Sequence, residues 1–211
     1  MSDFAIEHAI AGYANPEDAV AFTYQQDGHH FYVISFAEAT WAYDLNTGLW
    51  HQRAYRNTTT GELERHRGVE HAFFNGVHVV GDYANGKLYR LDPEVYTDDG
   101  DEIYRERVWA QIEAEGRRMF FHRGELVAAM GVGLDGDSET GADPQVWLSW
   151  SDDGGRTWSN QHARTLGRIG AFRNRAIWRR MGTSRNRYFK LWTSAPVPIQ
   201  WMGFNIELEV A

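Results

Sequence analysis

The fold class is decided by one stretch, AFTYQQDGHHFYVISFAEATWAYDLNTGLWH, which spans residues 21–51. It contains four short runs rich in aromatic and β-branched residues, which are typical of β-strands. Asp27-Gly28 is a strong signal for a tight hairpin turn, and Asn46-Thr47-Gly48 marks a second turn. The predicted strands are residues 21–25, 30–36, 40–44 and 49–51. Four strands within about 30 residues have the size of one propeller blade.

The same succession of strands and turns returns at a spacing of about 45 residues, as expected for successive blades. Asn75-Gly76 and Asn85-Gly86 are the predicted turns of the second repeat. The strands predicted for the second, third and fourth repeats are residues 70–74, 77–83, 87–92, 118–121, 126–130, 145–150, 176–180 and 204–208. We therefore predict an all-β, β-propeller-like fold with about four to five four-stranded blades.

A single helix is predicted, over Phe4 to Ala14, because the Asn15-Pro16 pair disfavours its continuation. The predicted domains are a helical lead-in over residues 1–19 and a β-propeller-like domain over residues 20–211. The aromatic content of 14% and the 21 glycines of the 211-residue chain fit a β-rich, turn-rich fold.

Composition excludes several classes of protein. There is no cysteine, and therefore no disulfide framework or thiolate chemistry. No apolar stretch has the length of a membrane-spanning helix, and the first residues lack the pattern of a signal peptide. The net charge of -8 is uneven: residues 1–153 hold 27 acidic and 11 basic residues, whereas residues 154–211 hold 2 and 10. The absence of cysteine fits assembly in a reducing cytoplasm.

The sharpest local motif is Trp150-Ser151-Asp152-Asp153-Gly154-Gly155-Arg156-Thr157-Trp158. It resembles the Asp box, a β-hairpin motif of sialidases and other propellers. We expect Asp153 to accept backbone N–H groups across the turn, and Gly155 to adopt a conformation that other residues avoid. Trp158 is expected to pack under the next strand. The predicted structural residues of this motif are Ser151, Asp153, Gly155, Thr157 and Trp158.

Arginine accounts for 19 of the 21 basic residues, and no acidic residue lies between Asp153 and Glu207. Two interpretations stay open for the arginines of this region. They either pair with acidic loops elsewhere in the fold, or they form a docking surface for an acidic partner or for DNA phosphates. The acidity of the whole chain argues against a dedicated DNA-binding protein. The candidate partner-contact residues are Arg173, Arg175, Arg179 and Arg180.

Metal and enzyme sites receive little support from the sequence. The histidines, including the adjacent His29-His30, do not show the spacing of a zinc site. The acidic runs 98–102 and 135–139 lack the spacing of a calcium-binding EF-hand, and we interpret them as solvated loops. Tyr188, Glu125 and Arg179 are residue types that sialidases use, but no spacing singles them out. We predict no catalytic residue, no cofactor and no metal, and keep a carbohydrate-binding or sialidase-like propeller as the alternative function.

Several stretches together resemble the packaged-DNA stabilisation proteins of short-tailed phages, which are also called tail hub or nozzle proteins. The resembling stretches are residues 24–29, 40–44, 48–53, 80–83, 95–100, 143–146 and 150–160. Members of this family are generally longer, so we expect this chain to correspond to their C-terminal, propeller-bearing part.

The resemblance implies a non-enzymatic virion protein of the tail, which oligomerises as a ring, closes the head after packaging and forms part of the ejection channel. It also implies contacts with other tail proteins such as an adaptor, needle or tailspike. DNA would pass through transiently, without sequence-specific binding.

Overall fold

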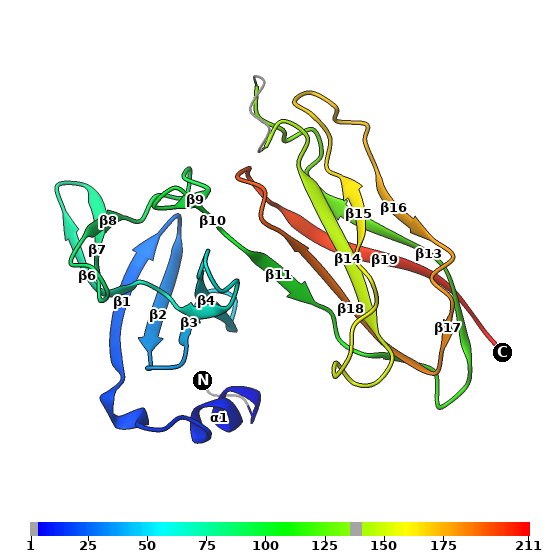
Figure 1. The fold of residues 1–211 in the computed structure, drawn as a ribbon, viewed down its shortest axis with the longest axis horizontal. Helices are drawn as coiled ribbons and strands as arrows, with labels where there is room; N and C mark the ends of the chain where they lie inside the picture. The colour runs from blue at the N-terminus through cyan, green and yellow to red at the C-terminus, as the bar shows by residue number, and fades with distance from the viewer. Residues whose placement is uncertain (1–3, 136–140) are drawn as a thin grey trace. The chain divides into compact units, whose positions relative to one another are not determined.

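The computed structural model describes residues 4–135 and 141–211. Within them the chain forms nineteen β-strands and one α-helix, which confirms the all-β class and the short N-terminal helix. Two compact units follow one another along the chain, Met1–Asp101 and Glu102–Ala211 (Figure 1). The chain therefore divides near residue 101, whereas the sequence analysis placed its only boundary between residues 19 and 20.

The first unit begins with the helix α1, which ends at Ala11, just before the helix-breaking Gly12 and short of the predicted end. No helix in the described part of the chain is long and apolar enough to cross a membrane. A 3-10 turn, η1, then leads into a five-stranded antiparallel sheet in the order β1-β2-β3-β4-β5. The elements are α1 (Phe4–Ala11), η1 (Pro16–Asp18), β1 (Val20–Gln26), β2 (His29–Ser35), β3 (Thr40–Asp44), β4 (Leu49–Arg56) and β5 (Leu63–Arg65).

Tight turns set the register of this unit. At the β1–β2 turn both Asp27 and Gly28 have positive φ, 52° and 80°, the conformation that asparagine, aspartate and glycine tolerate best. Asn75 and Gly76 repeat it with φ of 48° and 79°. Both turns lie where the sequence predicted them.

A second, three-stranded sheet follows in the order β6-β7-β8, and a two-stranded one pairs β10 with β9. Tyr24, Val33 and Ala42 of the first sheet form a small buried core with Phe22 and Phe31 packed against it. The strands are β6 (Gly68–Phe74), β7 (Val77–Asp82), β8 (Leu88–Arg90), β9 (Thr97–Asp98) and β10 (Asp101–Glu102). Neither larger sheet has the predicted four strands, and no closed propeller is confirmed.

The second unit consists of two antiparallel sheets. The first has the order β11-β18-β14-β15, with β12 also paired to β18, and in the second β13 pairs with β16, β17 and β19 (Figure 1). The strands are β11 (Arg105–Val108), β12 (Ile112–Glu113), β13 (Met119–Ala128), β14 (Gln145–Ser151), β15 (His162–Thr165), β16 (Ala176–Arg179), β17 (Thr183–Ser184), β18 (Asn186–Thr193) and β19 (Trp201–Val210).

The inner faces of these two sheets share one hydrophobic core. Alternate residues of β18 are buried, as expected for a strand with one face toward a core. Phe189 of β18 meets Phe121 of β13 edge to face, with ring centroids 5.6 Å apart. Val146 and Leu148 of β14 belong to the same buried cluster. The second unit is therefore a β-sandwich in its packing.

One local prediction in this unit was wrong. Residues 118–121 and 126–130 were expected to be separate strands, but β13 runs through both, with a shift of register between Phe121 and Arg123. Gly124 lies inside this strand. A Cβ there would lie 2.6 Å from the Phe204 ring of β19, so the glycine allows the two strands to approach closely.

Candidate functional site

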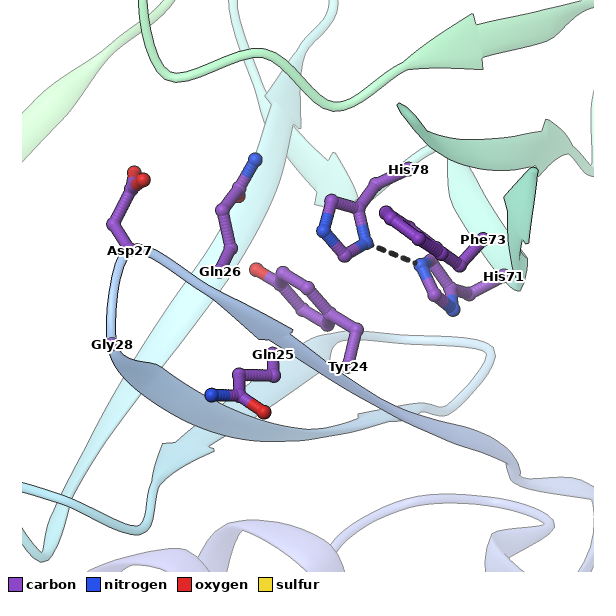
Figure 2. Close-up of a pocket in the computed structure, with 8 residues that line it drawn as sticks. All are labelled: Tyr24, Gln25, Gln26, Asp27, Gly28, His71, Phe73 and His78. Carbon is purple, nitrogen blue, oxygen red and sulfur yellow. Dashed lines mark hydrogen bonds between the residues drawn. The ribbon is translucent and has the colours of Figure 1, made fainter. Parts of the chain in front are cut away.

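A pocket of about 490 Å³ opens in the first unit. One wall is the end of β1 with the Asp27-Gly28 turn, and the other comes from the β6–β7 hairpin. Figure 2 shows the rings of His71, Phe73 and His78 gathered on that hairpin, with Tyr24 on β1. The complete lining is Tyr24, Gln25, Gln26, Asp27, Gly28, His71, Phe73 and His78.

Two histidines meet in this pocket. Nε2 of His71 lies 2.9 Å from Nδ1 of His78, a hydrogen bond in which one ring donates and the other accepts. His71 also stacks on Phe22, with centroids 5.6 Å apart. Burial lowers the pKa of His71, and the neighbouring His78 lowers it further. His71 therefore stays neutral under conditions in which a free histidine would begin to protonate.

The lining of the pocket is mostly aromatic and polar. Phe73 and Tyr24 offer ring surfaces, and Gln25 adds an amide group at the edge. Among the residues that the structure describes, no group of three or more His, Asp or Glu side chains is placed to hold a metal ion. Planar or apolar groups match the aromatic part of this lining, because rings stack on aromatic faces, and imidazole nitrogens can exchange hydrogen bonds with them.

The sequence analysis did not identify this pocket, although a signal for it was present. The two-residue turn at Asn75-Gly76 places Phe73 opposite His78. Side chains two positions apart share a face of a strand, so His71 lies on the same face as Phe73. The register of this hairpin, worked out from the sequence, would have predicted that the three rings lie together.

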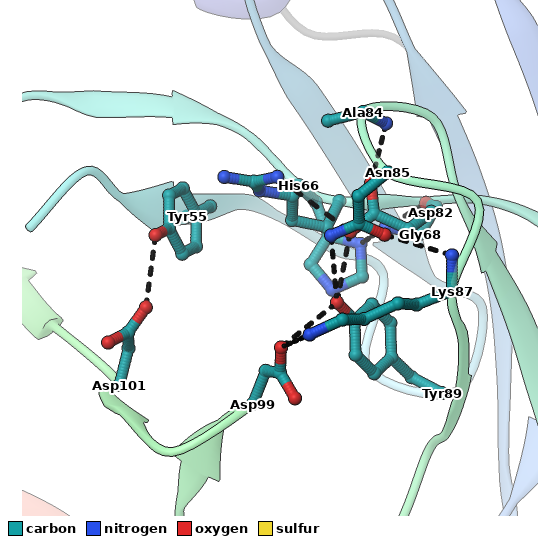
Figure 3. A network of polar contacts seen from close by, with 11 residues as sticks. Tyr55, His66, Gly68, Asp82, Ala84, Asn85, Lys87, Tyr89, Asp99 and Asp101 are labelled. Carbon is teal, nitrogen blue, oxygen red and sulfur yellow. Dashed lines mark hydrogen bonds and ion pairs between the residues drawn. The ribbon is translucent and has the colours of Figure 1, made fainter.

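A polar network joins the acidic segment 98–102 to the rest of the first unit (Figure 3). Lys87 binds Asp99 with its Nζ 2.6 Å from Oδ2, and this contact lowers the pKa of Asp99. Tyr55 donates a hydrogen bond of 3.0 Å to Asp101. Asp82 is buried and accepts bonds from the Ala84 N–H and the Tyr89 hydroxyl. These aspartates therefore fasten the segment to neighbouring strands.

The second acidic run, residues 135–139, lies outside the described residues except for Asp135. Asp135 is exposed.

The Ser151–Trp158 turn joins β14 to β15, and its carboxylate organises it. Both backbone and side chain of Thr157 donate to Asp153, at 2.9 Å and 2.7 Å. Ser151 donates to the same carboxylate at 2.7 Å, and its own oxygen receives the Gly155 N–H. These donors hold the pKa of Asp153 far below its usual range.

The other two predicted residues of the motif are Gly155 and Trp158. Gly155 has φ of +88°, a conformation that residues with a side chain rarely adopt. Trp158 is half-buried, and Nζ of Lys190 on β18 lies 4.2 Å from its ring centre. The turn thus has the hydrogen bonds expected of an Asp box, and its assignment to that motif stays a prediction.

The four candidate partner-contact arginines are all exposed, but they differ in their contacts. Arg175 forms a two-pronged pair with Glu125, at 2.6 Å and 2.8 Å, which lowers the pKa of that carboxyl group. Arg173, Arg179 and Arg180 are in no ion pair with a described residue. Of the four candidates, internal pairing thus accounts for one, and the other three face solvent.

The residues considered for sialidase chemistry have other contacts. Glu125 is occupied by Arg175 and by Arg123. Tyr188 donates its hydroxyl proton to Gln111. Arg179 is exposed at the end of β16. Within the described residues, no hydrogen bond or ion pair joins these three side chains to one another.

Comparison with known protein families assigns the chain to a family. By its architecture it is an all-β protein in which a unit of small antiparallel sheets precedes a β-sandwich. The family model "Bacteriophage P22 Gp10, beta-propeller" matches residues 1–96, and "Bacteriophage P22 Gp10, beta-sandwich" matches residues 104–209. The chain belongs to the bacteriophage P22 Gp10 family. A search of curated proteins found no match.

These matches confirm the resemblance and correct the extent of the propeller. The two matched ranges meet where the structure divides, near residue 101. The third and fourth predicted repeats, beyond residue 117, lie in the sandwich match and not in the propeller match. The local strand pattern of a sandwich and of a blade is the same, because both have one buried face per sheet.

Proposed function

We propose that this chain is a tail hub or nozzle component that helps to close the phage head and retain the packaged DNA. The observation that carries the proposal is the succession of the two family matches, which together span residues 1–96 and 104–209. Membership of this family makes the chain a phage structural protein and a virion component. Its place in the tail, next to an ejection channel, is our inference from the resemblance.

The charge of the chain is compatible with a conduit. The net charge of -8 disfavours tight, sequence-independent binding of DNA, and a channel wall must release the DNA during ejection. We propose no enzymatic activity, and transient passage of DNA without specific contacts. Adaptor, needle or tailspike proteins and further copies of the chain are the proposed partners. Arg173, Arg179 and Arg180 are exposed and available for such contacts.

The test is loss and rescue of DNA retention. Phage particles assembled without this chain are expected to package DNA and then lose it, which nuclease sensitivity of the purified heads would measure. Supplying the chain during assembly should restore nuclease-resistant genomes. Particles that keep their DNA without the chain would contradict the proposal. Turnover of a sialoside panel by the purified chain would instead favour the sialidase-like alternative.

A further inference from the structure

One loop of the second unit exposes large apolar side chains. It is the RIGAFR loop, defined as residues 168–173, and all six of its residues are exposed. The exposed fraction is 59% for Ile169 and 76% for Phe172. Leu166, just before the loop, is 1% exposed and anchors it in the sandwich core. Exposed apolar groups gathered in one place commonly mark a protein-binding surface.

The backbone of this loop is held in place. Gly131 N–H donates to the Leu166 carbonyl at 2.8 Å, and Gly170 N–H donates back to the Gly131 carbonyl at 3.2 Å. A Cβ on Gly131 would lie 2.9 Å from the backbone of Ala171, so the two segments are in close contact. A loop fixed in this way presents Phe172 at low cost in conformational entropy.

Arginines stand at both ends of the apolar segment. Neither Arg168 nor Arg173 forms an ion pair or a side-chain hydrogen bond with any residue described in the structure. Arg175 and Arg187, by contrast, are paired with Glu125 and Asp152. Within the described residues, the loop therefore presents two cations without an ion pair around an apolar centre. An acidic surface with an apolar depression is complementary to it.

We propose that the RIGAFR loop docks on the first unit of a second copy of this chain. That unit, residues 1–101, carries 16 acidic and 6 basic residues, so its charge is opposite to that of the loop. It also contains the aromatic pocket of about 490 Å³. The inference rests on the proposed function to the extent that a virion ring needs contacts between copies.

A protein partner fits this loop better than DNA does. Arginines that clamp phosphates are usually accompanied by polar donors, whereas Ile169 and Phe172 lie between these two arginines. Burial of the two side chains supplies favourable free energy only against an apolar surface. Since the loop and its receiving surface are different parts of the chain, the contact is head to tail, and repetition of it generates rings or filaments.

The experiment is sedimentation of the full chain over a wide concentration range, at low and at high salt. Wild-type chain should self-associate. Phe172→Ser should weaken association about tenfold or more at both salt concentrations. The Arg168→Ser/Arg173→Ser double variant should weaken it mainly at low salt, because charge attraction is screened at high salt. The matched controls are Met202→Ser, 69% exposed on β19, and Arg117→Ser/Arg118→Ser, both exposed before β13.

Three outcomes would overturn the proposal. In the first, the wild-type chain is monomeric at every concentration. In the second, Phe172→Ser and Met202→Ser have equal effects on association. In the third, the chain binds DNA in a salt-sensitive manner, and the arginine double variant abolishes this binding without changing the oligomeric state. Melting curves verify that the variants stay folded. DNA retention is measured separately in particles supplied with Phe172→Ser. If the wild-type chain self-associates but does not restore DNA retention to the particles, the proposed function alone is refuted. If it restores DNA retention without self-associating, the docking alone is refuted.

Discussion

Arg187 and Asp152 form a two-pronged ion pair in which the cation is buried and the anion is not. Nε and Nη2 of Arg187 lie 2.6 Å and 2.7 Å from the two carboxylate oxygens. The arginine side chain is 2% exposed and the aspartate side chain 41%. The guanidinium also lies 4.4 Å from the Phe121 ring centre and donates to the Met181 carbonyl. The carboxylate thus compensates a charge that the sandwich core cannot solvate.

Removal of the carboxylate should therefore destabilise the second unit. Asp152→Ala leaves the buried guanidinium without its counter-ion and should lower the free energy of unfolding by about 2 kcal/mol, less than for a fully buried pair because Asp152 is partly exposed. Urea unfolding followed by tryptophan fluorescence measures the change. Glu113→Ala, at an exposed position on β12, is the control and should have little effect. Equal stability of the two variants would contradict this account of Arg187.

The Asp153 turn should give the second unit an acid-sensitive stability. Its folded pKa lies below the unfolded value, which is about 3.9. The stabilisation is therefore complete above that pH and is lost as the pH falls below it. Asp153→Ala should lower the melting temperature at neutral pH and should flatten its decline between about pH 5 and pH 3. An unchanged slope in the variant would show that another carboxylate is responsible.

Two half-buried histidines should make the first unit sensitive to mild acid. Burial is the main cause that lowers the pKa of both His66 and His71. The unfolded chain then binds more protons near pH 6, so stability is complete above about pH 6.5 and falls as the pH is lowered. His71→Phe keeps a ring against Phe22 and should reduce the loss between about pH 7.5 and pH 5.5, measured by urea midpoints. His30→Asn, on β2 of the other large sheet of this unit, is the control, and equal slopes in both variants would refute the assignment to His71.

The close approach at Gly124 predicts a large difference between two glycine variants. Gly124→Ala places a methyl group 2.6 Å from the Phe204 ring and should cost about 2 kcal/mol of stability through overpacking. Gly203→Ala, on the neighbouring strand β19, meets nothing within 4 Å and should be close to neutral. Chemical denaturation of both variants decides the matter. A neutral Gly124→Ala would mean that Phe204 moves aside without cost.

Turn chemistry explains what could be predicted from sequence. The Asp27-Gly28 and Asn75-Gly76 pairs need positive φ at both residues, and few other pairs accept it, so these hairpins are visible in the sequence itself. The same holds for the Ser151–Trp158 turn, where short polar side chains bond to nearby backbone. Local patterns of this kind identified the strands and the family resemblance.

Pairing between distant strands could not be predicted in the same way. β13 pairs with β19, about 80 residues further along the chain. Nothing in the alternation of residues 119–128 indicates that partner, so the segment was assigned to a third blade. The burial of single side chains could not be predicted either. Arg187 looks like the other arginines near it in the sequence, yet it is buried while Arg185 is exposed.

The position of β13 in its sheet has a consequence for synthesis of the protein. β1 to β4 pair in sequence order, so each strand meets its partner soon after it leaves the ribosome. β13 is translated early in the second unit but needs residues 201–210 for its longest pairing. Its longest pairing must therefore wait for the translation of more than 70 further residues. We therefore expect the first unit to fold first on the nascent chain. The second unit stays incomplete for longer and should depend more on chaperones during translation.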